Sequence, residues 1–165
     1  MVNSASDAEA AVRVVKYPPK GTRGVGLART QGYGVDFENY KEWVEKESIV
    51  IVQIEHIDAV ENFKEILSTE GVDDFIIGPY DLSGSLGIPS EFDDPKVIEA
   101  LEVVKQAAKK CNIISGFHVV PAMPDMLIDK IHEGYRFLAY SLDTLFLAET
   151  CRNDQRIIND GNELK

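Results

Sequence analysis

Short apolar runs rich in β-branched residues alternate along the chain with segments of helical period. The run 49–54 is almost continuous β-branched sequence, which is typical of a strand covered on both faces. Later runs at 75–77, 113–120 and 137–142 predict three further strands. Because a helical pattern follows each strand, the order predicts βα units that form a parallel sheet.

Apolar residues recur at helical spacing in the segments around these strands. The predicted helices are 6–15 (opened by Ser6 or Asp7), 37–46, 57–68, 95–110, 124–133 and 143–147. Asp94 and Pro95 suit the start of one helix, and Gly134 suits the end of another. The polar residues 153–165 predict a frayed tail. The stretch 17–34 predicts a long loop of the kind that is usually functional or disordered.

The composition limits the class of protein. The chain has 165 residues, 44% of them hydrophobic, and a formal net charge of −11, which suggests one domain over 1–165 with its own core. No apolar run is long enough to span a membrane. The first residues lack the basic start and apolar stretch of a signal peptide, so we expect none. The acidic balance argues against nucleic acid and anionic membranes as partners. Cys111 and Cys151 lack metal-type spacing and fit reduced thiols, so we expect a cytoplasmic location.

Two carboxylates follow neighbouring predicted strands. Ligands of parallel α/β folds bind at the carboxyl ends of the strands. Glu55 and Asp81 end the first two strands about one βα repeat apart, so they are expected at one rim. Such a pair suits Mg²⁺ or Mn²⁺, which fills its other positions with water and substrate oxygens. A structural interpretation stays open, in which Asp81 caps the turn 82–86 and Glu55 is a solvated strand end.

Other polar residues have equally open interpretations. His118 could point from the third strand into the site, or it could be a satisfied core histidine. Arg23 in the glycine-rich loop could hold an anion or be an exposed structural arginine. Backbone N–H groups of the turn 78–83 could hold a carboxylate. The sequence contains no G-x-S-x-G motif, no Walker loop and no dinucleotide-type G-x-G-x-x-G after a strand.

Several motifs occur in a fixed order. They are YPPKGTRGVG at 17–26, VQIE at 52–55, IGPYDLS at 77–83 and SLD at 141–143. Over about residues 1–152 they resemble the HpcH/HpaI aldolase family, which includes 2-dehydro-3-deoxyglucarate aldolase and 4-hydroxy-2-oxoheptanedioate aldolase. The resemblance implies a (β/α)₈ TIM barrel of the phosphoenolpyruvate/pyruvate superfamily. It also implies a divalent-metal (class II) aldolase that forms or cleaves 4-hydroxy-2-oxo acids from pyruvate and an aldehyde.

The resemblance also implies roles for individual residues. By position, Glu55 and Asp81 match the family's ligands for Mg²⁺, Mn²⁺ or Co²⁺. Gln53, Tyr80 and Asp81 match positions that contact the substrate, Tyr80 through its backbone N–H. The loop 23–34 matches a segment near the active site and at subunit contacts, which implies a homo-oligomer.

The chain is shorter than the barrel that the resemblance implies. A full barrel takes about 250 residues, so the alignment covers about strands 5 to 8, with residues 1–4 at the end of the fourth strand. The family's catalytic histidine and arginine lie in the missing part, and His118 is the acid–base candidate here. Two functions stay open, a metal-dependent aldolase domain or an impaired homologue that binds metal and 2-oxo acids or assembles with itself. A half-barrel exposes apolar edges, so we expect oligomerisation that covers them.

Overall fold

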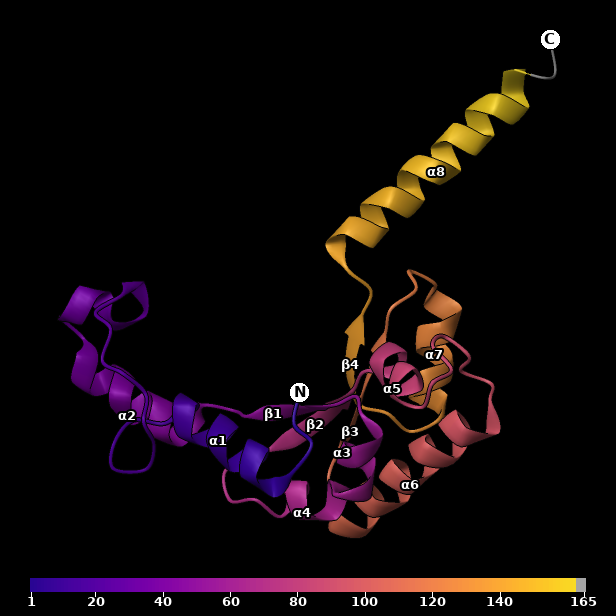
Figure 1. Ribbon diagram of the computed structural model, residues 1–165. Helices are drawn as coiled ribbons and strands as arrows, with labels where there is room; N and C mark the ends of the chain where they lie inside the picture. The colour runs from indigo at the N-terminus through magenta and orange to yellow at the C-terminus, as the bar shows by residue number, and fades with distance from the viewer. Residues whose placement is uncertain (163–165) are drawn as a thin grey trace.

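A four-stranded parallel sheet with helices packed against it forms the centre of the protein (Figure 1). The computed structural model describes residues 1–162. The strands are β1 (Ile51–Ile54), β2 (Asp74–Ile77), β3 (Ser115–Val119) and β4 (Phe137–Tyr140), in that order across the sheet. The helices are α1 (Ala5–Val15), the 3₁₀ helix η1 (Arg29–Gly34), α2 (Phe37–Glu47), α3 (Ile57–Glu61), α4 (Phe63–Leu67), α5 (Pro79–Ser85), α6 (Pro95–Cys111), α7 (Pro124–His132) and α8 (Asp143–Asn162). Each strand is parallel to the next, so the predicted α/β fold with a parallel sheet is confirmed.

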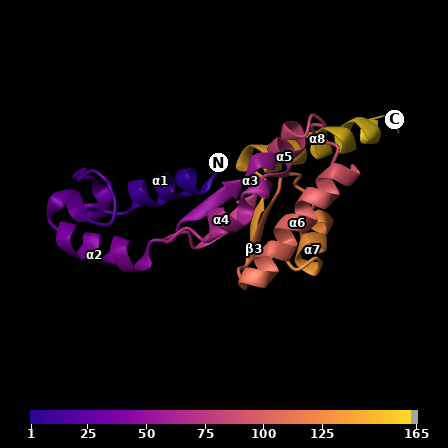
Figure 2. The same ribbon diagram turned by 60° about the horizontal axis from the view of Figure 1, so that its bottom comes forward.

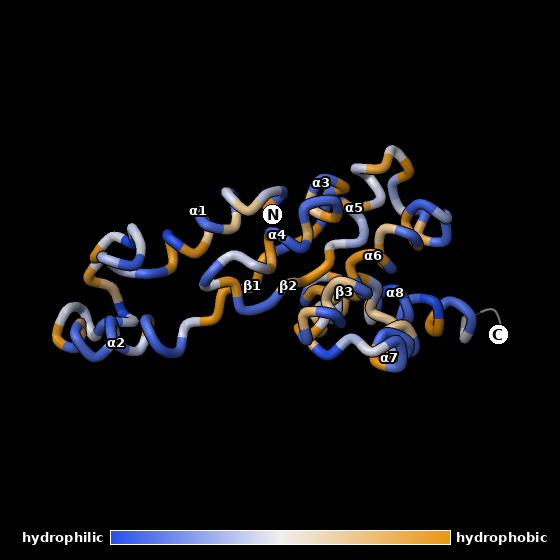
Figure 3. Tube along the Cα trace, turned by 90° about the horizontal axis from the view of Figure 1, so that it is seen from below, coloured by the Kyte–Doolittle hydropathy of each residue, from blue (hydrophilic) through white to orange (hydrophobic). Residues whose placement is uncertain are grey.

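One face of the sheet is buried against helices. Side chains alternate between the two faces of a strand, and the buried positions of β1 and β2 are Val52, Ile54, Phe75 and Ile77. The rings of Phe63 and Phe75 meet edge-on, with 4.8 Å between their centroids, which joins α4 to β2. Figure 2 shows α6 and α7 beside β3, and Figure 3 shows hydrophobic residues along β1 and β2. This packing fixes where the carboxyl ends of the strands lie.

The opposite face of the sheet is open within the described part of the chain. Gln53 and Phe137 are exposed there, and Ile49 ahead of β1 is 70% exposed. The prediction of a first strand covered on both faces is therefore wrong for residues 1–162, because the described helices pack on one side. On the free edge of β1, the backbone N–H of Val2 donates to the carbonyl of Gln53 (3.2 Å), as a neighbouring strand would.

The N-terminal helices differ in their bounds from those that the pattern predicts. The cap of α1 is Ser4, not Ser6 or Asp7, because the Ser4 hydroxyl accepts the backbone N–H of Asp7. The helix predicted over 57–68 is divided at Asn62 into α3 and α4. There the Asn62 side-chain amide donates to a carbonyl of the N-terminal segment (2.9 Å).

The C-terminal helix is longer than the pattern predicts. α8 continues to Asn162, past the predicted end at Leu147, so most of the predicted polar tail 153–165 is helical. Its last three residues lie outside the described residues. The ion pair of Arg152 with Glu149 (2.6 Å) supports the helix locally. Figure 1 shows α8 extending away from β4 and the sheet. None of the helices within residues 1–162 is long and apolar enough to cross a membrane.

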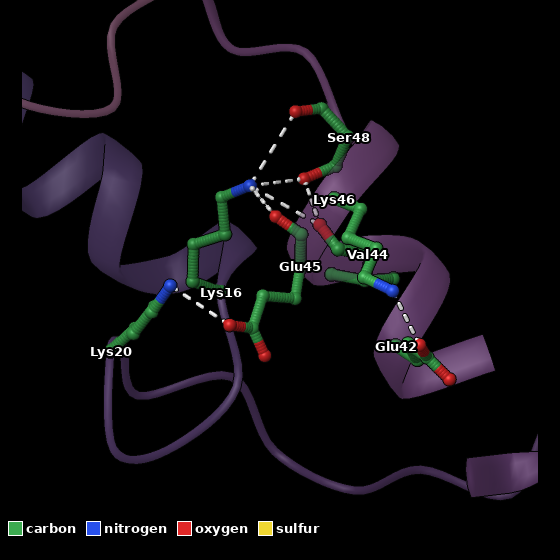
Figure 4. Close-up of polar contacts among 7 residues, drawn as sticks. All are labelled: Lys16, Lys20, Glu42, Val44, Glu45, Lys46 and Ser48. Atoms are coloured by element: carbon green, nitrogen blue, oxygen red, sulfur yellow. Dashed lines mark hydrogen bonds and ion pairs between the residues drawn. The ribbon is translucent and has the colours of Figure 1, made fainter. Parts of the chain in front are cut away.

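Residues 16–48 form an arm that projects from the sheet (Figure 1). Lys16 ties its two ends together, as Figure 4 shows. Its ammonium donates to the carbonyls of Val44 (3.2 Å) and Glu45 (3.3 Å) and to the hydroxyl of Ser48 (2.7 Å). These carbonyls end α2, where helical carbonyls lack intrahelical partners, so the lysine caps the helix.

Candidate metal and substrate site

Two carboxylates lie at the carboxyl ends of β1 and β2. Glu55 directly follows β1, and Asp81 lies in the first turn of α5, which begins after β2. The pairing of β1 with β2 puts Glu55 level with Gly78, the residue before α5. Both acidic residues therefore belong to one rim of the sheet.

Gly78 leaves room for side chains from β1. A Cβ atom at this position would lie 2.8 Å from Oε2 of Glu55 and 3.2 Å from Nε2 of Gln53. The first of these contacts is too short for any real side chain, so a larger residue would displace the Glu55 carboxylate. A glycine in such a place often marks a close approach of another group. Here it lets Glu55 and Gln53 converge beside the start of α5.

The two carboxylates are electrostatically coupled. The pKa of Glu55 is raised above its ordinary value, first by burial and second by the negative charge of Asp81. Residues 1–162 contain no group of three or more His, Cys, Asp and Glu side chains that could hold a metal ion. Two carboxylates nonetheless fit Mg²⁺, which usually takes one or two from the protein and keeps water or substrate oxygens in its other positions. The donor set therefore fits a hard divalent cation.

A titration of Glu55 tests this coupling. In the metal-free protein we expect its pKa to lie above 4.5, the ordinary value. Asp81→Asn should lower the pKa, because it removes the like charge, but not fully, because burial remains. The measurement is the carboxyl ¹³C chemical shift of Glu55 against pH, and an unchanged midpoint in Asp81→Asn would contradict the proximity of the two groups.

The same pKa sets the sign of two pH effects. Because the folded protein holds the Glu55 proton more tightly than the unfolded chain, this group's stabilising contribution is present below pH 4.5 and is lost as the pH rises through the raised pKa. A divalent cation competes with that proton, so its addition should lower the titration midpoint of Glu55.

Gln53 and Tyr80 lie close in sequence to the two carboxylates, Gln53 before Glu55 and Tyr80 before Asp81. Gln53 is exposed on the open face, with its amide close to Gly78. The ring of Tyr80 packs edge-on against that of Phe92, with 4.8 Å between centroids, and the side chain is 39% exposed. The Tyr80 backbone N–H belongs to the first turn of α5, where such groups lack intrahelical partners. It is available to an anionic ligand at this turn.

His118 lies on β3 at the same level of the sheet. The pairing of β2 with β3 puts it level with Gly78. Its neighbours Phe117 and Val119 are buried on the helical side, so His118 belongs to the open face. Two strand spacings of about 4.8 Å each separate its backbone from that of Glu55. A ligand held at Glu55 would therefore be within the reach of a histidine side chain.

Arg23 lies in the arm and has structural partners. Its guanidinium lies over the rings of Tyr17 (5.0 Å to the centroid) and Tyr40 (5.5 Å). It also donates to the Tyr40 hydroxyl (3.0 Å) and to the carbonyl of Val15 (3.4 Å). Of its two interpretations from sequence, these contacts favour the structural one.

The burial of Ser141 at the rim is not predicted by the sequence. It follows β4, has a left-handed φ of 55°, and is 7% exposed. Its hydroxyl is buried and has no hydrogen-bond partner within the described residues. The SLD motif places a serine at this strand end, but the motif does not predict that its side chain is buried or that its hydroxyl lacks a partner.

The fold is a parallel α/β sheet, and two carboxylates lie at its carboxyl rim. The sequence profile of the HpcH/HpaI aldolase/citrate lyase family matches residues 1–149, and the chain belongs to this family.

Comparison with individual proteins agrees with this assignment. The 2-keto-3-deoxy-L-rhamnonate aldolase of Escherichia coli (strain K12) is 36% identical over 159 residues, which are 95% of this chain and 58% of the relative. The crystal structure of an HpcH/HpaI aldolase from Desulfitobacterium hafniense DCB-2 has a TM-score of 0.79 and 33% identity, and the match covers 95% of this chain and 61% of that one. A family protein from Burkholderia cenocepacia J2315 has a TM-score of 0.87 and 28% identity over 96% of this chain and 63% of that one. The chain thus spans about three fifths of the length of these relatives.

Proposed function

We propose that this chain forms part of a divalent-metal-dependent aldolase of class II type. It would form or cleave 4-hydroxy-2-oxo acids from pyruvate, or a related 2-oxo acid, and an aldehyde. The observation that carries the proposal is the convergence of Glu55 and Asp81 at one rim, in a chain of an aldolase family. Oxygen ligands favour Mg²⁺ or Mn²⁺, with Co²⁺ as an alternative. The exposed, free Cys111 and Cys151 support a cytoplasmic location, where thiols stay reduced.

Each residue of the rim has a defined task in this proposal. Glu55 and Asp81 would hold the cation, which supplies Lewis-acid stabilisation of the negative charge that develops when the pyruvate methyl group loses a proton. The Tyr80 N–H at the start of α5 would orient the pyruvate carboxylate. The Gln53 amide, beside Glu55, would donate to a substrate oxygen.

Proton transfer would fall to His118. In the forward direction, a base takes a proton from the methyl carbon, that carbon forms a bond to the aldehyde carbonyl carbon, and the aldehyde oxygen takes up a proton. Cleavage is the reverse. A histidine titrates near neutral pH and can serve in both directions. The level of His118 on β3 supports this role.

We further propose that the described sheet corresponds to about strands 5 to 8 of an eight-stranded barrel, with residues 1–165 as one partial domain. The free edge of β1, the bond from Val2 and the exposed Phe137 on the open face support this. Such a surface favours assembly into a homo-oligomer that covers it. The alternative function, an impaired homologue that binds metal and 2-oxo acids or assembles with itself, is favoured by the same open face.

Hydrogen exchange at the pyruvate methyl group distinguishes the two functions. In D₂O with Mg²⁺ or Mn²⁺, an aldolase should incorporate deuterium into pyruvate, because deprotonation precedes carbon–carbon bond formation. We expect exchange that chelators abolish and that His118→Asn slows by about 100-fold, a typical contribution of a general base. The measurement is ¹H NMR of the methyl signal. If pyruvate binds but no exchange follows with either metal, the impaired homologue is the better description.

A further inference from the structure

Two buried side-chain polar atoms within residues 1–162 have no hydrogen-bond partner, Oδ1 of Asn3 and Oγ of Ser141. Both lie at the carboxyl rim of the sheet, because Asn3 lies beside the end of β1 and Ser141 follows β4. Leaving a buried polar atom unpaired costs free energy of folding, so each such atom in a native structure calls for an explanation. Asn3 is the one of the two that lies next to a proposed metal ligand.

The N-terminal residues continue the sheet beyond the free edge of β1. The Val2 N–H donates to the Gln53 carbonyl, and in a parallel pair such a donor lies one residue past the residue that is level with the acceptor. The pair of β1 and β2 shows the same offset. Asn3 is therefore level with Glu55, and one strand spacing of about 4.8 Å separates their backbones.

The side chain of Asn3 belongs to the open face of the sheet. Val2 is 5% exposed and packs in the same core cluster as Ile54, the residue level with it, so its side chain lies on the helical side. Side chains alternate along an extended chain, which puts Asn3 on the opposite side. The same alternation from Ile54 puts Gln53 and Glu55 there.

The backbone of Asn3 is held by two hydrogen bonds. Its N–H donates to Oδ2 of Asp7 in the first turn of α1 (2.9 Å), and its carbonyl accepts the side-chain amide of Asn62 (2.9 Å). The backbone groups are thus satisfied within the protein, and the side-chain oxygen is the group that still needs a donor. An amide oxygen can only accept a hydrogen bond.

A metal-bound water molecule is a donor of the matching kind, because its oxygen is engaged by the cation and its protons point outward. Mg²⁺ held by one or two carboxylates keeps several such water molecules. The Glu55 carboxylate lies against Gly78, on the β2 side of β1, whereas Asn3 lies on the other side. A water molecule, and not a direct bond to the cation, suits this separation.

We propose that Oδ1 of Asn3 accepts a hydrogen bond from a water molecule on the cation held by Glu55 and Asp81. The proposal rests on the function proposed above, because it needs that cation. Asn3 is then a positioning residue, which orients the hydration shell from the edge of the sheet that lies opposite Asp81. Groups of this kind, which contact a metal only through its ligands, contribute about 10- to 100-fold to metal affinity.

Two variants of Asn3 test the proposal without requiring turnover. Asn3→Ala removes the acceptor and should weaken Mg²⁺ binding by about 10- to 100-fold. Asn3→Asp keeps an acceptor and adds a negative charge beside the cation, so it should bind Mg²⁺ at least as tightly as the unchanged protein. Titration calorimetry gives the affinities. In the absence of metal, Asn3→Ala should melt no lower than the unchanged protein, because it removes an unpaired polar atom.

Ser141→Ala is the matched control. It removes the other buried, unpaired side-chain oxygen of the same rim, which lies on the far side of the sheet from β1. Mg²⁺ affinity should stay within about twofold, because the hydroxyl is three strand spacings from the backbone of Glu55.

The outcomes separate this proposal from the function on which it rests. If the unchanged protein binds Mg²⁺ and Asn3→Ala binds it equally well, the role of Asn3 is overturned and the carboxylate site stands. A loss of affinity that Ser141→Ala shares overturns the role as well. If Asn3→Ala does not fold, Asn3→Asp decides, and weaker binding by that variant counts against the proposal. If the unchanged protein binds neither Mg²⁺ nor Mn²⁺, the metal site falls and the role of Asn3 falls with it.

Discussion

Glu55→Gln and Asp81→Asn should each weaken Mg²⁺ binding by at least about 100-fold, beyond the 10- to 100-fold typical of residues that only support a metal ligand. Both changes keep the shape of the side chain and remove its negative charge. Within residues 1–162, Glu55 and Asp81 are the two carboxylates proposed for the cation, so the loss of either would leave a hard cation with one charged ligand from this part of the chain. Titration calorimetry with Mg²⁺, or Mn²⁺ relaxation, gives the affinities directly.

A third carboxylate of the same sheet provides the control. Asp74 begins β2 at the opposite end of the sheet, and the pKa of its side chain is also raised, chiefly by burial. Asp74→Asn therefore removes a partly buried charge without touching the rim, and metal affinity should stay within about twofold. If the Glu55 and Asp81 variants bind as well as Asp74→Asn does, the carboxylate pair is not the metal site.

The repeating units of the fold could be predicted from sequence because they depend on local patterns. The β-branched run before Glu55 and the Asp94-Pro95 start of α6 are signals that the chain carries within a few residues, and the structure confirms both elements. The resemblance to the aldolase family could also be recognised from short motifs, and the comparisons confirm it. Patterns of this kind do not depend on what packs against the element.

What could not be predicted depends on distant partners. At the division of the helix 57–68, Asn62 contacts the N-terminal segment, and no local pattern shows this contact. The continuous apolar run of β1 reads as buried on both sides, although the described residues cover one. α8 extends past Leu147 through residues that are mostly polar, whereas the apolar pattern used for the prediction marks only its first turn.

At the site, too, the sequence predicts which residues are present but not how they contact one another. The spacing of Glu55 and Asp81 predicts two carboxylates at one rim, but the sequence leaves open whether they interact. The structure adds the close approach over Gly78 and the effect of Asp81 on the pKa of Glu55. It also places Tyr80 at the wall of a cleft, which no sequence motif predicts.

Gly78→Ala should weaken Mg²⁺ binding by about 10- to 100-fold, as changes in groups that position a metal ligand do. The backbone of Gly78 has a φ of −99° and a ψ of 95°, which alanine adopts without strain, so the effect of the change is steric. The new methyl group would lie 2.8 Å from Oε2 of Glu55 and 3.1 Å from its Cβ. The carboxylate must move to relieve this contact, and it then no longer faces the position it shares with Asp81.

A second glycine of the same segment separates this effect from a general loss of stability. Gly84 lies on α5, and a Cβ atom there would have no heavy atom within 4 Å. Gly84→Ala should therefore leave metal binding unchanged and slightly raise the melting temperature, because alanine favours a helix. A variant Gly78→Ala that melts normally and still binds Mg²⁺ as tightly as Gly84→Ala would show that the carboxylate of Glu55 is free to bind from elsewhere. The close approach over residue 78 would then have no part in the site, and Glu55 would need no glycine beside it to reach a cation.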